Sequence, residues 1–303
     1  MNQNNNNNVE NYDNEIDLLK IFKVVWERKF FIGSFTSLAA ILTVIYALNL
    51  PNVYTSSALL SPTSQDDSIS SSLGGLSGLA GLAGVSLPAG NISNSQLAVK
   101  RIQSFEFFSK YVFPNIKLQN LMAVEKWDST DDTITYDNSI YDAKSGNWNK
   151  KPSTQKSFRE FKKIISISQE ELTGIVHLSI DHKSPKIAKE WADLIIYNIN
   201  ESMRELDKQD AQNSIDFLNE SSKSIRVQSI KDVVGILLES QMQTLMLASS
   251  NEAYIFKKID SPIVPEQKSG PKRALITILG TVLGTILSLL IVLFQHTRKS
   301  YTD

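Results

Sequence analysis

Two long apolar stretches without a charged residue constrain this chain more than any other feature. The first runs from Phe30 to Leu50 and the second from Ala274 to Phe294, with 21 residues in each. At the 1.5 Å rise of an α-helix each stretch is about 31 Å long, close to the ~30 Å hydrocarbon core of a bilayer. Buried helices of soluble proteins rarely run past ~18 residues without a charge. The sequence therefore predicts transmembrane helices over residues 30–50 and 272–294.

A cleaved signal peptide is the alternative interpretation of the first stretch. Signal peptides have an apolar run of ~7–15 residues that ends at a small-residue cleavage site. Here the apolar run is longer, begins only at residue 30, and is followed by Asn49-Leu50-Pro51-Asn52. We therefore expect no cleavage.

Basic residues beside the spans predict their orientation, because Lys and Arg are retained on the cytoplasmic side. The second span is flanked by two basic residues on each side and gives no preference. After the first span there is no Lys or Arg until Lys100. Four basic residues precede the first span: Lys20, Lys23, Arg28 and Lys29. We expect cytoplasmic tails at 1–29 and 295–303, and a large periplasmic domain at 51–271.

The composition of residues 51–271 excludes several classes of function. This region has 23 Lys and Arg against 26 Asp and Glu, a net charge of −3, which argues against a nucleic-acid surface. The chain has no cysteine, so it has no disulfide, thiol nucleophile or thiolate metal site. The Asn-rich start is predicted to be disordered, and residues 14–29 are predicted to form a short amphipathic helix.

No pattern in the sequence indicates a catalytic, cofactor or metal site. His177 and His182 lie five residues apart around a strand end, which places them on opposite faces. There is no Gly-x-Ser-x-Gly, His-Glu-x-x-His or Walker A motif. The uncharged stretches Phe30–Leu50 and Ala274–Phe294 contain no Asp, Glu, Lys, Arg or His, so a proton relay is not expected. We predict that the protein is not an enzyme and binds no cofactor.

Residues 61–90 form a segment rich in Leu and Gly. Its glycines could expose backbone N–H groups to a phosphate, but a P-loop also needs a Lys, and none lies between residues 30 and 99. We expect a small-residue loop or short helix that packs closely on a neighbouring surface. Leucine recurs every three residues, at Leu73, Leu76, Leu79 and Leu82.

The remaining patterns predict an α+β membrane protein whose periplasmic domain has a small mixed β-sheet base and a long projecting α-helix. Stretches rich in β-branched and aromatic residues, two of them alternating, predict strands. Helical spacing predicts helices over 95–113 and 153–163, with a loop from about residue 126 to the second of them. The strands are expected at 53–60, 164–168, 173–180 and 253–260.

The longest predicted element is a helix over about residues 185–250. Ser184-Pro185 is typical of a helix start, and apolar residues recur at helical spacing after it. A continuous helix of ~65 residues would reach roughly 100 Å, with an interruption expected at Ser221–Ser224. Its apolar stripe needs a partner chain or a returning segment. We predict that three of its residues lie at a subunit or intrachain interface: Leu237, Met242 and Leu245.

Two motifs near the C-terminus are candidate contact sites. Prolines break helices and favour extended backbone, so Pro262, Pro265 and Pro271 are expected to fix how the outer domain joins the second span. Within that span, Gly280 and Gly284 form a Gly-x-x-x-Gly pattern, which lets two helix backbones approach closely.

These pieces in this order resemble the polysaccharide co-polymerases of bacterial inner membranes, also called Wzz-type chain-length determinants. The resemblance rests on the acidic-then-apolar run from Glu15 to Lys20, the two spans, the strand at Tyr54 and the long helix. It rests also on the Leu/Gly segment 75–84, the Pro262–Arg273 run, and a motif formed by Ser184, Pro185, Ala188, Trp191 and Ala192.

The resemblance implies a non-enzymatic homo-oligomer that acts with a membrane polysaccharide polymerase. It implies control of the length of lipopolysaccharide O-antigen or a related glycan, and contact with the bilayer and with the growing glycan. Some relatives carry a tyrosine kinase domain with a Walker A loop, which this sequence does not contain. An adaptor for capsule or exopolysaccharide export remains the alternative.

Overall fold

The computed structural model describes residues 24–63, 93–250 and 253–300, and these fall into two units. One unit combines the chain up to Leu50 with the chain from Pro271 onward, and the other comprises Pro51–Gly270. The predicted disordered start, most of the amphipathic helix and the Leu/Gly segment lie outside the described residues.

The first unit consists of helices α2 (Lys29–Asn49) and α10 (Arg273–Ser300), which pack against each other. Both are long and apolar enough to cross a membrane, over Lys29–Asn49 and Arg273–Gln295. Most of their large apolar side chains are exposed, as expected for helices whose outer surface faces lipid. The predicted class, an α+β protein with two apolar helices near its ends, is confirmed.

A four-stranded sheet forms the centre of the second unit, with strand order β6-β7-β1-β8. All three pairings are antiparallel, whereas the sequence predicted a mixed sheet. A short turn joins β6 to β7, and such a turn allows only antiparallel pairing. Alternate residues of β7 are buried, including Val176, Leu178 and Ile180, so one face of the sheet covers the core. The strands are β1 (Tyr54–Pro62), β6 (Ile165–Gln169), β7 (Val176–His182) and β8 (Phe256–Asp260).

Short helices replace the single helix predicted over residues 95–113. Helix α4 (Asn94–Ile102) begins with a capping box between Ser93 and Gln96. The Ser104 hydroxyl accepts a hydrogen bond from the Phe107 backbone N–H and so starts a new helix, α5 (Phe105–Phe107). A π-helical turn η1 (Phe108–Val112), a 3-10 turn η2 (Phe113–Asn115) and α6 (Leu118–Met122) follow. Helix α7 (Thr154–Ile164) lies close to its predicted position.

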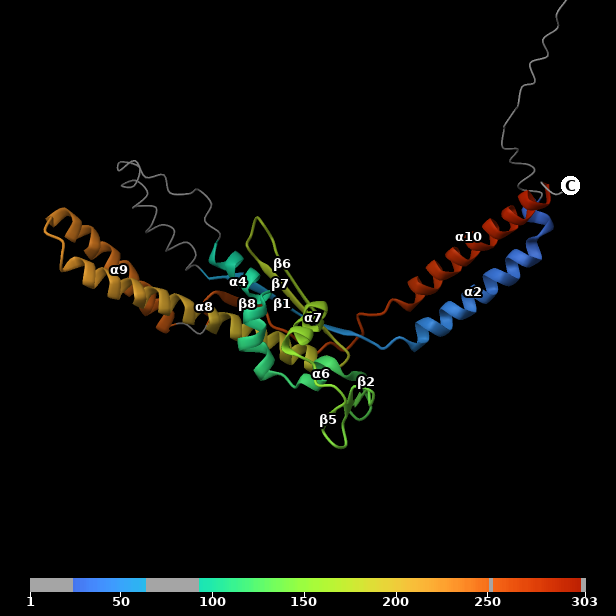
Figure 1. Ribbon diagram of the computed structural model, residues 1–303, viewed down its shortest axis with the longest axis horizontal. Coiled ribbons are helices and arrows are strands. Elements are labelled where there is room, and N and C mark those ends of the chain that lie inside the picture. Colours follow the sequence, from blue (N-terminus) through green and yellow to red (C-terminus); the bar gives the residue numbers. More distant parts are fainter. Residues whose placement is uncertain (1–23, 64–92, 251–252, 301–303) are drawn as a thin grey trace, which may run out of the picture. The chain divides into compact units, whose positions relative to one another are not determined.

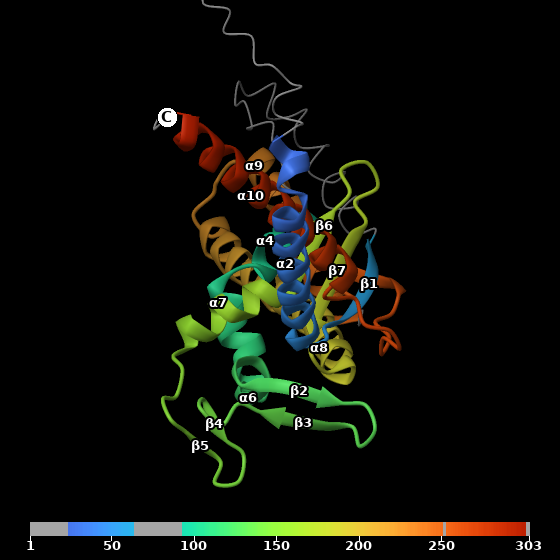
Figure 2. The ribbon, with the colours of Figure 1, turned by 90° about the vertical axis from the view of Figure 1, so that its right-hand side faces the viewer.

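Two small hairpins occupy the region where the sequence predicted a loop. Strand β2 (Val124–Asp128) pairs with β3 (Thr133–Tyr136), and β4 (Tyr141–Asp142) pairs with β5 (Asn147–Trp148), as Figure 2 shows in green. Asp128 and Asp142 each accept a backbone N–H two residues on, which forms an Asx turn at each bend. The cross-strand pair Tyr141 and Trp148 has ring centroids 4.9 Å apart.

The predicted long helix is a hairpin of two helices, α8 (Pro185–Ser222) and α9 (Gln228–Ser250). The chain reverses at residues 223–227, next to the predicted interruption at Ser221–Ser224, and α9 returns along α8 (Figure 1). Helix α8 alone is about 57 Å long at 1.5 Å per residue, well short of a 100 Å rod. The returning segment that the apolar stripe requires is therefore α9.

The core lies between the sheet and the first half of α8. The buried stripe of α8 contributes Trp191, Ile195 and Ile199 to this core. Phe108 of η1 and Phe161 of α7 belong to the same buried cluster. These positions on α8 recur at intervals of four, so they share one face of the helix. The N-terminal half of the predicted apolar stripe is therefore buried in the core of the domain.

A buried histidine joins the end of β7 to the start of α8 and to α6. His182 Nδ1 accepts the Ser184 backbone N–H at 2.9 Å, so Nε2 carries the proton and donates to the Asn120 carbonyl at 2.9 Å. Burial lowers the pKa of His182, and the charge of Lys183 lowers it further. The imidazole is therefore held neutral in the folded protein.

The burial of neutral His182 predicts that the free energy of unfolding is lower at acidic pH. The unfolded chain binds a proton at His182 more readily than the folded chain does, so the free energy of unfolding falls as pH drops below about 6.5. Urea midpoints at pH 7.5 and pH 5.0 measure the difference. We expect the His182→Gln variant to lose part of this pH dependence and the exposed-site control His177→Gln to keep it. Equal pH dependence in both variants would contradict the prediction that His182 causes part of the loss of stability in acid.

Candidate interaction surfaces

The two glycines of the Gly-x-x-x-Gly pattern lie against α2 of the same chain. A Cβ atom added to Gly280 would lie 2.1 Å from Thr43 Cγ2, and one added to Gly284 would lie 2.5 Å from Ala39 Cβ. Neither position has room for a larger residue, so the helix backbones are in close contact. Residue numbers rise along α10 as they fall along α2, so the pair is antiparallel. Thr43 and Ala39 were not identified from the sequence.

A second contact joins the ends of these helices. Arg273 Nη2 donates to the carbonyl of Leu50 at 3.0 Å, and Leu50 is the residue that follows α2. The last carbonyls of a helix lack partners within it and carry partial negative charge, so a cation there is stabilising. The last turn of α2 has no basic residue of its own. Arg273 therefore caps α2 from the first turn of α10.

The proline-rich segment after β8 continues beside β1. The Ser56 hydroxyl donates to the Ile263 carbonyl at 2.7 Å, and Val53 N donates to the Gly270 carbonyl at 2.9 Å. Pro262 is buried and Pro265 is half-buried. Since proline has no N–H, a regular ladder cannot continue through these positions. The segment is instead held by side-chain contacts and by a bridge at its end.

Pro271 lies in the other unit, two residues before the start of α10. Its carbonyl accepts the Arg273 backbone N–H at 2.9 Å. The expectation that the three prolines fix how the outer domain joins the second span stays a prediction.

The three candidate residues of α9 fall into two groups. Leu237 and Leu245 are half-buried, on the same side of the helix as the buried Val234 and Ala248. Since α9 packs against α8, this side faces α8. Met242 is 53% exposed and points elsewhere. Leu237 and Leu245 therefore lie on the side of α9 that faces α8, and Met242 does not. That any of the three contacts another copy of the chain stays a prediction. Further exposed apolar residues of α9 are Val233, Ile236 and Met246.

A buried asparagine of α8 holds the start of β8. The side-chain oxygen of Asn200 accepts the backbone N–H groups of Ile255 and Phe256 at 2.8 and 2.9 Å. Its amide nitrogen donates to the carbonyls of Phe256 and Ile196 at 3.2 and 2.9 Å. All hydrogen-bonding groups of this side chain are occupied.

A second contact holds the same segment to α8. The buried Tyr254 donates its hydroxyl to Asp207 Oδ2 at 2.5 Å. Asn200 and Asp207 are seven residues apart, two turns along one face of α8. Neither contact was predicted from the sequence, since buried polar residues on a helix are recognised only through their partners.

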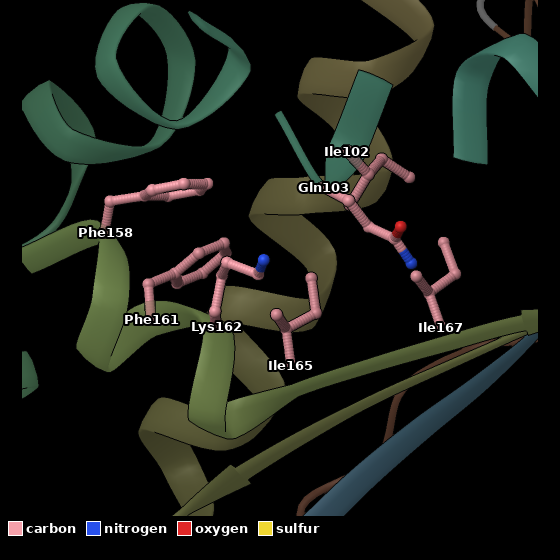
Figure 3. Close-up of a pocket in the computed structure, with 7 residues that line it drawn as sticks. All are labelled: Ile102, Gln103, Phe158, Phe161, Lys162, Ile165 and Ile167. Carbon is pink, nitrogen blue, oxygen red and sulfur yellow. The ribbon is translucent and has the colours of Figure 1, made fainter. Parts of the chain in front are cut away.

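A cavity of about 200 Å³ lies between α4, α7 and β6 (Figure 3). Its lining is mainly apolar, with one amide and one amine: Ile102, Gln103, Phe158, Phe161, Lys162, Ile165 and Ile167. The lining pairs no acid with a base. Among the described residues no group of three His, Asp or Glu residues could hold a metal ion.

Residues 14–112 match the model of the Wzz family, described as the chain length determinant protein. The match covers the acidic-then-apolar run, the first span, β1 and the Leu/Gly segment. It confirms the resemblance predicted from the sequence. The similarity is therefore to a family of chain length determinants, in a chain with two helices that are long and apolar enough to cross a membrane. No curated protein matches the sequence.

Three solved structures are similar to the chain. A full-length bacterial polysaccharide co-polymerase has 14% identity and a TM-score of 0.42, and the match covers 94% of this chain and 99% of that one. A fragment of WzzB, a polysaccharide co-polymerase from Salmonella Typhimurium, has 14% identity, a TM-score of 0.31 and coverage of 72% and 100%. A mutant of the Shigella flexneri lipopolysaccharide O-antigen chain-length regulator WzzBSF has 9% identity, a TM-score of 0.23 and coverage of 72% and 100%. All three TM-scores are below 0.5.

Proposed function

We propose that this protein is a non-enzymatic scaffold of the bacterial inner membrane that regulates the chain length of a surface polysaccharide. The observation that carries the proposal is the Wzz match over residues 14–112, in a chain with an apolar helix near each end. Wzz-type co-polymerases are regulators that act with polymerases and form oligomers. A membrane polymerase and further copies of this chain are accordingly the proposed partners. The proposed glycan is O-antigen or a related polymer.

The proposed topology has both tails in the cytoplasm and residues 51–271 in the periplasm. Four basic residues precede the first span and none follows it before Lys100, which supports this orientation. The close contact of Gly280 and Gly284 with α2 supports an arrangement in which the two spans insert as one antiparallel pair.

The exposed side of α9 is the proposed contact between copies of the chain. Met242 and Met246 are exposed and lie about one turn apart on α9, away from the buried Val234 and Ala248. Exposed large apolar residues concentrated on one element favour a protein contact over a solvated surface. The chain-length function would then depend on this side of α9.

Deletion of the gene, followed by complementation, tests the function. Without the protein, we expect the ladder of surface glycan on a gel to lose its preferred length, and the wild-type gene to restore it. The Met242→Asp variant should fail to restore it and should form smaller oligomers, because a buried unpaired charge is unfavourable at an interface. The control Gln209→Asp places the same charge at an exposed site of α8 and should restore the ladder.

An unchanged ladder after deletion would refute length control. Loss of surface glycan with its length distribution preserved would instead favour the export adaptor. Full activity and normal oligomer size of Met242→Asp would show that this part of α9 is not a contact between copies of the chain.

A further inference from the structure

The turn of the α8–α9 hairpin differs in charge from the helix that leads to it. Residues 205–220 of α8 contain one Lys and five acidic residues, a net charge of −4. Residues 221–231 contain Lys223, Arg226 and Lys231 and no acidic residue, a net charge of +3. The whole chain has a formal charge of −1, so this basic group is a local feature. We call residues 221–231 the hairpin tip.

Large apolar side chains are exposed at and beside the same tip. Val227 is 55% exposed and Ile230 48% exposed. Phe217 is 70% exposed and lies five residues before the end of α8, about 8 Å along the helix. Helix α9 packs on α8, and Figure 1 shows no other described element beside the turn of this hairpin. The tip therefore presents basic and apolar groups together.

The basic groups of the tip are available to a partner. Lys223 contacts Glu220 at 2.7 Å, but both side chains are more than 70% exposed, and such surface pairs contribute little. Arg226 and Lys231 are exposed. Asp232 follows Lys231 directly, but it lies 100° further around α9 and accepts a hydrogen bond from Gln228.

We propose that the hairpin tip docks on an anionic lipid surface. Lys and Arg beside exposed apolar side chains are the combination that binds the interface of a membrane with acidic headgroups. The cations interact with lipid phosphates while Val227 and Ile230 enter the headgroup region. The acidic stretch 205–220 is repelled by the same surface, so contact is restricted to the end of the hairpin.

The expected affinity of one tip is low. Each basic residue near a charged membrane strengthens binding by about fivefold, so three cations give only weak, reversible attachment. Several tips in one oligomer would bind together and raise the apparent affinity strongly. Lipid binding depends on the surface of residues 205–231 and not on the proposed glycan function, so vesicle binding and the glycan ladder can fail independently.

The test uses the full chain in nanodiscs of zwitterionic lipid, mixed with vesicles and separated by flotation. We expect the protein to float with vesicles that contain about 30% phosphatidylglycerol, and not with pure phosphatidylcholine vesicles. High salt should release it, because these interactions are screened. The Arg226→Gln/Lys231→Gln variant should bind roughly 25-fold more weakly. The matched control Lys150→Gln/Lys151→Gln removes two exposed charges elsewhere and should bind as the wild type does.

Three results would overturn the proposal. They are no binding of the wild type, equal binding to both kinds of vesicle, and equal loss in the tip variant and the control. Retention on immobilised polygalacturonate without vesicle binding would assign the tip to an acidic glycan and would also overturn it. A Val227→Ser/Ile230→Ser variant that floats as the wild type does would exclude the apolar part of the contact.

Discussion

Replacement of Gly280 by leucine is expected to separate the two membrane helices. Even a single Cβ atom at this position would lie 2.1 Å from Thr43 Cγ2 and 2.9 Å from Thr43 Cβ, so the helices must move apart. Overpacking of this kind costs about 1–3 kcal/mol, and small residues at such an interface are what lets the two backbones approach closely. The chain has no cysteine, so a single introduced pair, Asn49→Cys with Lys272→Cys, can report the separation. We expect the cross-linking rate of this pair to fall severalfold.

Further variants serve as controls for the cross-linking experiment. Gly33 lies on α2, and a Cβ atom added there would meet nothing within 4 Å, so Gly33→Leu should leave the cross-linking rate unchanged. The smaller change Gly280→Ala should be rescued by Thr43→Gly, since this removes the atoms that clash. Normal cross-linking in Gly280→Leu would show that the close contact of the helices is not required.

Replacement of Asn200 by leucine is expected to produce the largest loss of stability in the outer domain. The variant leaves the backbone N–H groups of Ile255 and Phe256 without the acceptor that Asn200 provides in the interior. A buried unsatisfied group costs about 1–3 kcal/mol, so we expect the free energy of unfolding to fall by about 2–5 kcal/mol. Urea unfolding followed by tryptophan fluorescence measures it.

Two further variants separate lost hydrogen bonds from changed shape. Asn200→Asp keeps the acceptor oxygens but buries a carboxyl group and loses the donor, so it should also destabilise the domain. Asn213→Leu introduces the same side chain at an exposed site of α8 and should change the unfolding midpoint little. A near-native midpoint for Asn200→Leu would mean that water or a rearranged backbone replaces its hydrogen bonds.

The features that depend on local composition could be predicted from the sequence. The two apolar helices follow from 21 uncharged residues in each stretch, and the strands around Ile165 and Val176 follow from alternation. The interruption near Ser221 was also recognisable. The return of α9 was not, because an apolar stripe looks the same whether its partner is another chain or the next helix.

The contacts that organise the candidate surfaces depend on partners far away in the sequence. Asn200 is 55 residues from Ile255, and Arg273 is 223 residues from Leu50. Neither residue type nor local spacing indicates such a pair. The short strands β2 to β5 were missed for a similar reason, since Asx turns and one aromatic cross-strand pair stabilise them rather than long alternating runs.

The bridge between Val53 and Gly270 has a practical consequence for the outer domain. Residues near its two ends are joined by backbone hydrogen bonds, at 2.9 Å from Val53 N to the Gly270 carbonyl and 2.9 Å from Ser269 N to the Val53 carbonyl. Domains whose ends meet in this way tolerate circular permutation and insertion into other proteins. We therefore expect that residues 51–270 can be transferred to another protein as one unit. A short peptide could close them into a ring, and an unrelated helical hairpin could carry them in place of the native anchors.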